Sequence, residues 1–289
     1  MGEDMTYKEL YLYGKQKLEE AEIAEAALDA RLLLEYICHT DRNELIVRAD
    51  SERSGMEETF YKTIVEKRAS HIPFQYLTGR QEFMGLGFQV NEHTLIPRQD
   101  TEVLVEEALY HLSDGMRILD LCTGSGCILL SLLRYSNECE GIGIDLSPKA
   151  LEVARENARQ LQVDAVFLEG DLFAPLMDFV SEKTRDTLFD MVVSNPPYIE
   201  TAVIGTLMPE VCEHEPRMAL DGGEDGLDFY RKIVGQASSH MRRGGYLLFE
   251  IGCGQGNVVK ELMCQAGFEQ VEVRKDYTGL DRVVFGVKP

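Results

Sequence analysis

The sequence predicts an α/β protein in which a mostly parallel sheet carries helices on both faces, preceded by a small helical region. From residue 117 onward, short apolar runs alternate with segments of helical periodicity, which is the pattern of a parallel sheet. The last two apolar runs follow one another without a helix, which predicts an antiparallel edge strand. The first 80 residues show helical periodicity and no strand pattern. We expect a helical domain over residues 1–74, a β-hairpin linker over 75–98 and a sheet domain over 99–289.

The helical region carries three segments with apolar residues at helical spacing, residues 6–21, 25–39 and 56–70. Pro73 lies just beyond the third segment, where a helix commonly ends. No motif of catalytic or metal-binding residues occurs here. We therefore expect this region to dock a partner or to pack against the rest of the chain.

The stretch QEFMGLGFQV predicts a β-hairpin that turns through Gly85, Leu86 and Gly87. It is followed by LIPRQDTEVLVEEALYHL, an extended entry into a helix. Asp100 or Thr101 is a suitable N-cap for this helix, because either side chain can accept from a free backbone N–H.

The sheet domain then predicts strands and helices in alternation. The expected strands are residues 117–121, 140–145, 165–171, 188–194, 244–251, 271–276 and 282–287, and the expected helices are 126–135, 147–161, 227–241 and 257–267. In such sheets, ligands bind beyond the carboxyl ends of the strands. The loops at those ends are therefore the first place to look for function.

Composition narrows the classes of partner. The chain of 289 residues has a formal net charge of −21, so it lacks the surplus of basic residues that binding to a phosphate backbone requires. We expect no direct contact with nucleic acid. Seven cysteines form no CxxC pair, which argues against zinc and disulfide frameworks, so we expect reduced thiols and no metal. No apolar run approaches the ~20 residues of a membrane span, and the acidic N-terminus is unlike a signal peptide, so we expect a cytoplasmic protein without membrane contact.

The first strand end carries a glycine-rich turn, Asp120-Leu-Cys-Thr-Gly-Ser-Gly126. Glycines let a backbone approach a ligand, with a helix N-terminus behind it. The turn is no dinucleotide fingerprint, because Leu129 occupies the third glycine position, and no Gly-Lys-Ser/Thr follows. We expect the cofactor-binding residues here to be Cys122, Thr123, Gly124, Ser125 and Gly126.

The next three strand ends are polar as well. Asp145 follows the glycine turn by about 20 residues, the spacing at which an acid accepts ribose hydroxyls. Asp171 can take an adenine amino group, and Leu172 can cover the ring. Asn195 begins the sequence Asn-Pro-Pro-Tyr198. A glycine turn, two acids and an amide without basic residues indicate a nucleoside that lacks phosphates, which points to S-adenosylmethionine.

The stretches ILDLCTGSG, IGIDLSPKALEVARENA and DMVVSNPPYI resemble the class I S-adenosylmethionine-dependent methyltransferases with a Rossmann-like sheet and an Asn-Pro-Pro-Tyr motif. Within them, FQYLTGRQEFMGLGFQV, LIPRQDTEVLVE, EPRMALDGGEDGLDFY and LLFEIG resemble the HemK/PrmC family, which methylates a glutamine of peptide chain release factors. The resemblance runs in detail from about Pro73 to the C-terminus. The N-terminal helical region resembles that of the family in being helical, but no sequence motif supports the resemblance there.

This resemblance implies the roles of the motif. The substrate would be the glutamine side-chain amide (N5) in the Gly-Gly-Gln loop of a release factor. The catalytic residues implied are Asn195, Pro196 and Tyr198, with Pro197 also in contact with substrate. Asn195 would also adjoin the cofactor. The Asn195 oxygen and the Pro196 carbonyl would accept the two amide hydrogens, while the prolines stiffen the backbone and Tyr198 forms a flat wall. We expect the enzyme to act as a monomer.

Alternatives and departures remain. The same motif also fits a ribosomal-protein glutamine methyltransferase. An adenine-N6 DNA methyltransferase uses a related Pro-Pro motif, but the net charge of −21 argues against it. A non-catalytic S-adenosylmethionine-binding module would need the glycine turn and Asp145 but not the intact Asn-Pro-Pro-Tyr motif. Cys122 stands where many family members have glycine, and it suits the turn if its φ is negative. Gln99-Asp100 replaces a commoner Pro-Glu. Arg98 is suited to holding the cofactor carboxylate or lining the substrate channel, and equally to forming an ion pair with a surface acid. The Gly222–Gly226 stretch predicts a tight loop near the site.

Overall fold

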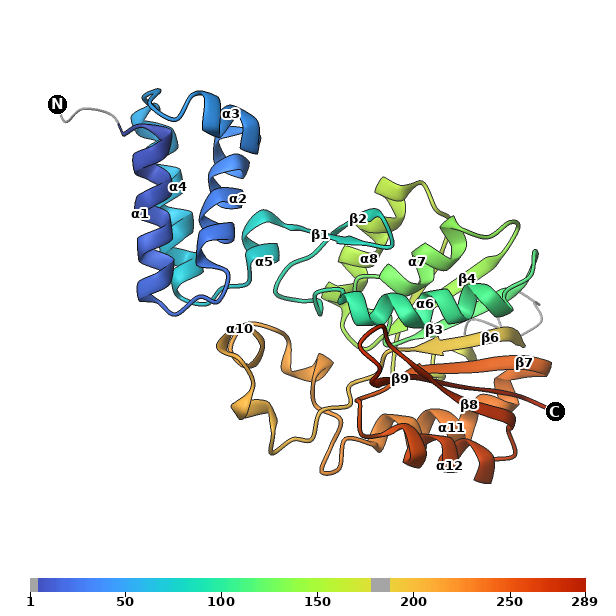
Figure 1. Cartoon of the computed structure of the whole chain (residues 1–289). Coiled ribbons are helices and arrows are strands. Elements are labelled where there is room, and N and C mark those ends of the chain that lie inside the picture. The colour runs from blue at the N-terminus through green and yellow to red at the C-terminus, as the bar shows by residue number, and fades with distance from the viewer. Residues whose placement is uncertain (1–4, 178–187) are drawn as a thin grey trace. The chain divides into compact units, whose positions relative to one another are not determined.

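The computed structural model describes residues 5–177 and 188–289 (Figure 1). All the helices and strands expected from the sequence lie within these two ranges. The strand expected at 188–194 begins one residue later, at Phe189. By compactness the chain divides into two units. One unit runs to Gly79 and also contains Met208–His214; the other comprises Arg80–Leu207 and Glu215–Pro289. No helix among the described residues is long and apolar enough to cross a bilayer.

The first unit is helical. Its helices are α1 (Tyr7–Glu20), α2 (Ala26–Cys38), α3 (Arg42–Val47), α4 (Gly55–Ala69), α5 (Phe74–Thr78) and α10 (Pro209–Cys212). The three expected helices correspond to α1, α2 and α4, and the short helices α3, α5 and α10 were not predicted from the sequence. Thr6 and Ser54 begin α1 and α4 with capping boxes, in which each hydroxyl accepts from a backbone N–H three residues on.

The centre of this unit is the fully buried Tyr61 of α4, whose hydroxyl donates to the Ala30 carbonyl at 3.0 Å. Gly14 of α1 makes room for this ring, because a Cβ at Gly14 would lie 1.9 Å from the Tyr61 oxygen. Arg68 of α4 is also buried, where it donates to Asp29 of α2 at 2.7 Å and to Glu210 of α10. The Met208–His214 segment is thus held to α4 although it is distant in sequence.

The second unit begins with a hairpin of β1 (Arg80–Phe83) and β2 (Leu86–Gln89). The expected hairpin is confirmed, but its turn lies at Met84–Gly85, because Phe83 pairs directly with Leu86. Both turn residues have positive φ, 52° and 68°, as a two-residue turn compatible with strand twist requires. The turn thus begins one residue earlier than the predicted turn through Gly85, Leu86 and Gly87.

The described residues form a seven-stranded sheet in the order β5-β4-β3-β6-β7-β9-β8. Its strands are β3 (Arg117–Leu121), β4 (Glu140–Asp145), β5 (Val166–Glu169), β6 (Phe189–Ser194), β7 (Met241–Glu250), β8 (Glu269–Lys275) and β9 (Asp281–Val287). The predicted alternating α/β sheet is confirmed, and β8 and β9 form the expected antiparallel pair. The strand that runs antiparallel to its neighbours is β9, which lies between β7 and the edge strand β8.

Helices cover both faces of this sheet (Figure 1). They are α6 (Gln99–His111), α7 (Cys127–Arg134) and α8 (Pro148–Leu161) on one face, and α11 (Asp228–His240) and α12 (Gly256–Gln265) on the other; the 3-10 turns η1 (Ile204–Thr206) and η2 (Arg217–Ala219) lie in the loop after β6. Alternate strand residues face opposite layers, so Ile118 packs toward α6–α8 and Leu119 toward α11 and α12.

The start of α6 corrects one expectation. The N-cap is Arg98, with no side-chain capping bond, and Asp100 and Thr101 already lie in the first helical turn. Thr101 is thereby turned inward, and only 2% of it is exposed.

Candidate active site

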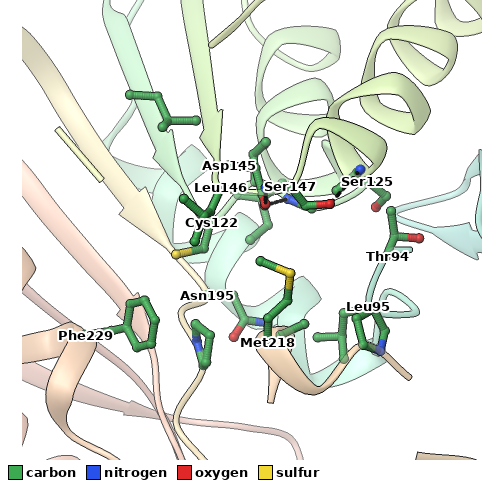
Figure 2. A pocket seen from close by; sticks show the side chains of 18 of the residues that line it. Thr94, Leu95, Cys122, Ser125, Asp145, Leu146, Ser147, Asn195, Met218 and Phe229 are labelled. Atoms are coloured by element: carbon green, nitrogen blue, oxygen red, sulfur yellow. Dashed lines mark hydrogen bonds between the residues drawn. The ribbon is translucent and has the colours of Figure 1, made fainter. Parts of the chain in front are cut away.

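A cavity of about 330 Å³ lies where the parallel strands end (Figure 2). The predicted site residues that line it are Cys122, Thr123, Gly124, Ser125, Asp145, Asp171, Leu172, Asn195 and Pro197. Gly126, Pro196 and Tyr198 are not in its lining. The carboxyl ends of β3, β4 and β6 and the residues that follow β5 therefore meet at one place, as the strand order requires.

Asp145 ties two backbone segments together. Its Oδ2 accepts from the Gly124 N–H at 2.8 Å, and its Oδ1 accepts from the Ser147 N–H at 2.9 Å. Figure 2 shows Asp145 and Ser147 on one side of the cavity, with Asn195 and Met218 across from them. Burial raises the pKa of the Asp145 carboxyl, and the backbone donors oppose this shift. Each carboxylate oxygen keeps a further lone pair for a ligand hydroxyl.

Cys122 has a φ of 59°, so the condition under which a cysteine would suit this turn, a negative φ, is not met. The left-handed conformation favours glycine, which explains why a glycine suits this turn. Burial raises the pKa of the Cys122 thiol far above its ordinary value, so the sulfur is a neutral packing group.

The two glycines of the turn have different surroundings. Gly124 has open space on its Cβ side and a φ of 55°. Gly126 has a φ of 79°, and a Cβ there would lie 3.2 Å from Leu130 and 3.3 Å from Ala154. Gly126 therefore lets α7 approach α8, whereas Gly124 leaves backbone open to the cavity.

The Asn-Pro-Pro-Tyr motif directly follows β6 and forms a turn that several hydrogen bonds restrain. The Ser194 hydroxyl at the end of β6 donates to the Leu121 carbonyl at 2.7 Å. The Asn195 Nδ2 donates to Thr101 Oγ1 at 3.3 Å, and the Tyr198 hydroxyl donates to Glu250 Oε1 at 3.2 Å. Both prolines are buried.

A second layer of contacts holds the backbone of this turn. The Gln255 Nε2 donates to the Tyr198 carbonyl at 3.1 Å and to the Gly226 carbonyl at 3.3 Å. The Gly222 N–H donates to the Ile199 carbonyl at 2.8 Å. A Cβ at Gly222 would lie 2.7 Å from Tyr198 Cα. The predicted tight loop near the site is confirmed, and its glycines allow it to pack on the motif.

Arg98 lines the cavity, but its guanidinium is engaged. Its NH2 group lies 2.7 Å from both carboxylate oxygens of Glu215, a residue that is 5% exposed. Of the roles open from the sequence, the structure shows an ion pair, but the acid is the buried Glu215 rather than a surface residue.

Comparisons with known proteins agree with this architecture. The chain is 42% identical over 269 residues to the release factor glutamine methyltransferase of Geobacter sulfurreducens, covering 93% of this chain and 92% of that protein. The chain belongs to the release factor glutamine methyltransferase family. It is also 40% identical to the protein of the same name from Caulobacter vibrioides, over 98% of this chain and 97% of that one.

Family models match both parts of the chain. A PrmC N-terminal domain matches residues 9–79, and a methyltransferase domain matches residues 112–250. A solved structure of a methyltransferase from Pyrococcus furiosus is similar in fold, with a TM-score of 0.52 and 18% identity, covering 71% of this chain and 90% of that chain. The resemblance to methyltransferases of this family, and the fold it implied, are confirmed.

Several lining residues were not predicted from the sequence. They are His93, Thr94, Leu95, Leu146, Ser147, Ala150, Met218, Phe229 and Lys232. Leu146 and Ser147 directly follow Asp145, so the strand-end argument extends to them. Met218 and Phe229 both lie in the stretch EPRMALDGGEDGLDFY, which carries the family resemblance, but nothing in that stretch indicated that these two side chains line the cavity.

Two further buried residues were also missed as functional candidates: Thr101, which lines the cavity, and Glu250, which does not. Glu250 is the last residue of β7, so the same reasoning about strand ends would have found it. Thr101 was considered only as a helix cap. Among residues 5–177 and 188–289, no group of three or more His, Cys, Asp or Glu is placed to hold a metal ion.

Proposed function

We propose that this chain transfers the methyl group of S-adenosylmethionine to the side-chain amide nitrogen, N5, of the glutamine in the Gly-Gly-Gln loop of peptide chain release factors. The observation that carries the proposal is Asn195, an amide at the end of β6 that lines a cavity opposite Asp145. The relatives named above, similar over nearly the whole chain, support the choice of substrate.

The cavity fits a nucleoside with a sulfonium tail. Its lining combines apolar side chains, among them Ile144, Leu146 and Phe229, with a few polar groups, as cofactor sites do. Asp145 would accept the ribose hydroxyls with its remaining lone pairs, Asp171 would take the adenine amino group, and Leu172 would cover the ring. When bound, S-adenosylmethionine supplies a methyl group already activated by positive charge on sulfur.

The chain's own residues then have to position a weak nucleophile. The lone pair of an amide nitrogen is delocalised into its carbonyl. The Asn195 side-chain oxygen and the Pro196 carbonyl would accept the two amide hydrogens, which fixes the nitrogen and directs its lone pair toward the methyl group. Orientation of this kind and preorganised acceptors are each capable of several kcal/mol.

Rigidity of the motif serves this task. Pro196 and Pro197 fix φ and offer carbonyls without competing N–H donors. Tyr198, tied to Glu250 through its hydroxyl, would present its ring as a wall for the planar amide. The methylated nitrogen can lose its proton to water, so the mechanism needs no strong base.

We assign residues 1–74 to docking of the release factor, 75–98 to a linker and 99–289 to methyl transfer, with the chain working as a monomer in the cytoplasm. The formal charge of −21 suits a basic protein partner and disfavours direct binding to nucleic acid.

The test offers labelled S-adenosylmethionine and three acceptors in parallel: a release factor, the same factor with its loop glutamine changed to alanine, and adenine-containing duplex DNA. Label on the intact factor alone supports the proposal. Label on DNA, or on the factor without the glutamine, contradicts the glutamine assignment. A ribosomal protein included as a fourth acceptor separates the related glutamine methyltransferase function.

A further inference from the structure

Asn195 is the first member of a line of polar side chains, in which it contacts the buried Thr101 and Thr101 lies beside the buried Glu250. Asn195 Nδ2 donates to Thr101 Oγ1 at 3.3 Å, and Thr101 in turn lies beside Glu250, whose Oε1 accepts from the Tyr198 hydroxyl at 3.2 Å. Thr101 and Glu250 are each 2% exposed. These residues come from α6, the loop after β6 and the end of β7, so the fold brings them together from three separate parts of the chain.

The direction of these hydrogen bonds follows from the group at the end of the line. An ionised carboxylate only accepts, so between the Thr101 hydroxyl and Glu250 the hydroxyl is the donor. The lone pairs of the hydroxyl oxygen then remain for Asn195, which must present its NH₂ group to Thr101. The Asn195 oxygen is thereby directed away from Thr101 and is free to accept from a substrate.

We propose that Thr101 and Glu250 are positioning residues that hold the Asn195 amide with its oxygen available to the substrate amide. Without them, rotation of the side-chain amide by half a turn would aim the NH₂ group at the substrate, where a donor would meet a donor. This inference rests on the proposed function, because it concerns how Asn195 is prepared for that reaction.

Apart from a role in orienting Asn195, the burial of the Glu250 carboxylate is unfavourable for folding. Its Oε2 has no hydrogen-bond partner among the described residues, and a buried carboxylate with an unpaired oxygen costs free energy of folding. The groups that act on it are Tyr198 from the loop after β6, Asp100 and Thr101 from α6, and Arg282 from β9, while the Tyr230 hydroxyl from α11 donates to its backbone carbonyl. Arg282 is itself paired with Asp276 and Asp100, at 3.1 and 3.0 Å.

Protonation of the Glu250 carboxyl would disrupt the contacts that orient Asn195 through Thr101. Burial raises the pKa of the Glu250 carboxyl from 4.5 to about 6, while the Thr101 hydroxyl, the Arg282 charge and the Tyr198 hydroxyl lower it. Below that pH the carboxyl becomes a donor, so the Thr101 proton is no longer fixed and the Asn195 orientation is released. Methyl transfer should therefore decline as pH falls through about 6.

The experiment compares Thr101→Val, which keeps the shape and removes the hydroxyl, with Thr101→Ser, which keeps the hydroxyl. We expect kcat of Thr101→Val to fall by about 10- to 100-fold, the scale of a lost oriented polar contact in a site. The KM for S-adenosylmethionine should stay within about threefold, since Asn195 chiefly orients the acceptor. Thr101→Ser should restore kcat to within about threefold of wild type.

Ser131→Ala provides the matched control. Ser131 of α7 is fully buried, and its hydroxyl has no partner among the described residues, so removing it tests the loss of a buried hydroxyl alone. Its kcat should equal that of wild type. The pH profile gives a second readout, because Glu250→Gln should abolish the decline in kcat near pH 6 along with most of the activity.

Wild-type kcat in Thr101→Val, or equal loss in the Val and Ser variants, would overturn the positioning role. A pH profile unchanged in Glu250→Gln would do the same. The wild-type enzyme, assayed on a release factor in the same series, keeps the two proposals apart. No transfer by wild type refutes the proposed function, whereas transfer by wild type with a fully active Thr101→Val refutes only this inference.

Discussion

Gly222 packs directly against the backbone of Tyr198: a Cβ on Gly222 would lie 2.7 Å from Tyr198 Cα and 2.8 Å from the Pro197 carbonyl oxygen. The glycine-rich loop is therefore the surface on which the Asn-Pro-Pro-Tyr turn rests. This contact explains why the loop needs residues without side chains, although it lies more than 20 residues beyond the motif.

Gly222→Ala should displace the Pro197–Tyr198 backbone, because backbone atoms cannot move aside as a flexible side chain can. We expect activity to fall about 100-fold, since shifts of about 1 Å in a site have that effect, and stability to fall by about 1–3 kcal/mol. Gly235→Ala is the control, as nothing lies within 4 Å of its Cβ position in α11. Its stability should rise by about 0.5–1 kcal/mol. A fully active Gly222→Ala would refute the packing argument.

Asp145→Asn should weaken S-adenosylmethionine binding by about 10- to 100-fold, the effect of losing one hydrogen bond to a charged group. An asparagine must turn its NH₂ toward either the Gly124 or the Ser147 N–H, so one of the two tethers is lost. Isothermal titration calorimetry measures the change. Asp114→Asn, at an exposed position, is the matched control and should bind like wild type. Equal affinity of both variants would contradict the assigned role of Asp145.

Glu250→Gln should change how stability depends on pH. The native carboxyl has a pKa of about 6, raised from 4.5 by burial, so between these values the native state holds a proton that the unfolded chain has lost. Its contribution to the free energy of unfolding therefore falls as pH rises through this window, by about 2 kcal/mol. Glutamine cannot ionise, so the difference in stability between variant and wild type should shift by about that amount.

Denaturant unfolding followed by circular dichroism at pH 4.5 and pH 7 checks this prediction. Relative to wild type, the variant should be more stable at the higher pH than at the lower, because other titrating groups cancel in the comparison. A difference that is independent of pH would show that the carboxyl carries no raised pKa.

Arg68→Ala should destabilise the helical unit by about 3–5 kcal/mol, because it leaves the buried Asp29 carboxylate without its partner. Lys15→Ala removes one side of an exposed pair with Glu19 and should change stability by less than about 1 kcal/mol. Thermal unfolding compares the two variants. A double variant, Asp29→Leu with Arg68→Met, should recover much of the loss. Equal effects of Arg68→Ala and Lys15→Ala would contradict the assigned burial.

The succession of strands and helices along the chain was accessible from sequence because hydrophobic periodicity is a local property. The placement of Asp145 and Asn195 at one cavity was also predictable, since parallel strands end at a common edge of the sheet. The left-handed Cys122 and the Met84–Gly85 turn were missed, because a backbone φ at a residue other than glycine is set by its surroundings. The placement of Met218, Phe229 and Met208–His214 depends on tertiary contacts that leave no periodic trace.

The role of Asn195 is the central claim, and tandem mass spectrometry of a release factor after a single turnover tests it most directly. We expect wild type and Asn137→Ala, a change at an exposed asparagine, to place one methyl group on the side chain of the loop glutamine. Asn195→Ala should leave that glutamine unmodified while still binding S-adenosylmethionine. Methylated glutamine at the wild-type rate from Asn195→Ala would contradict the account.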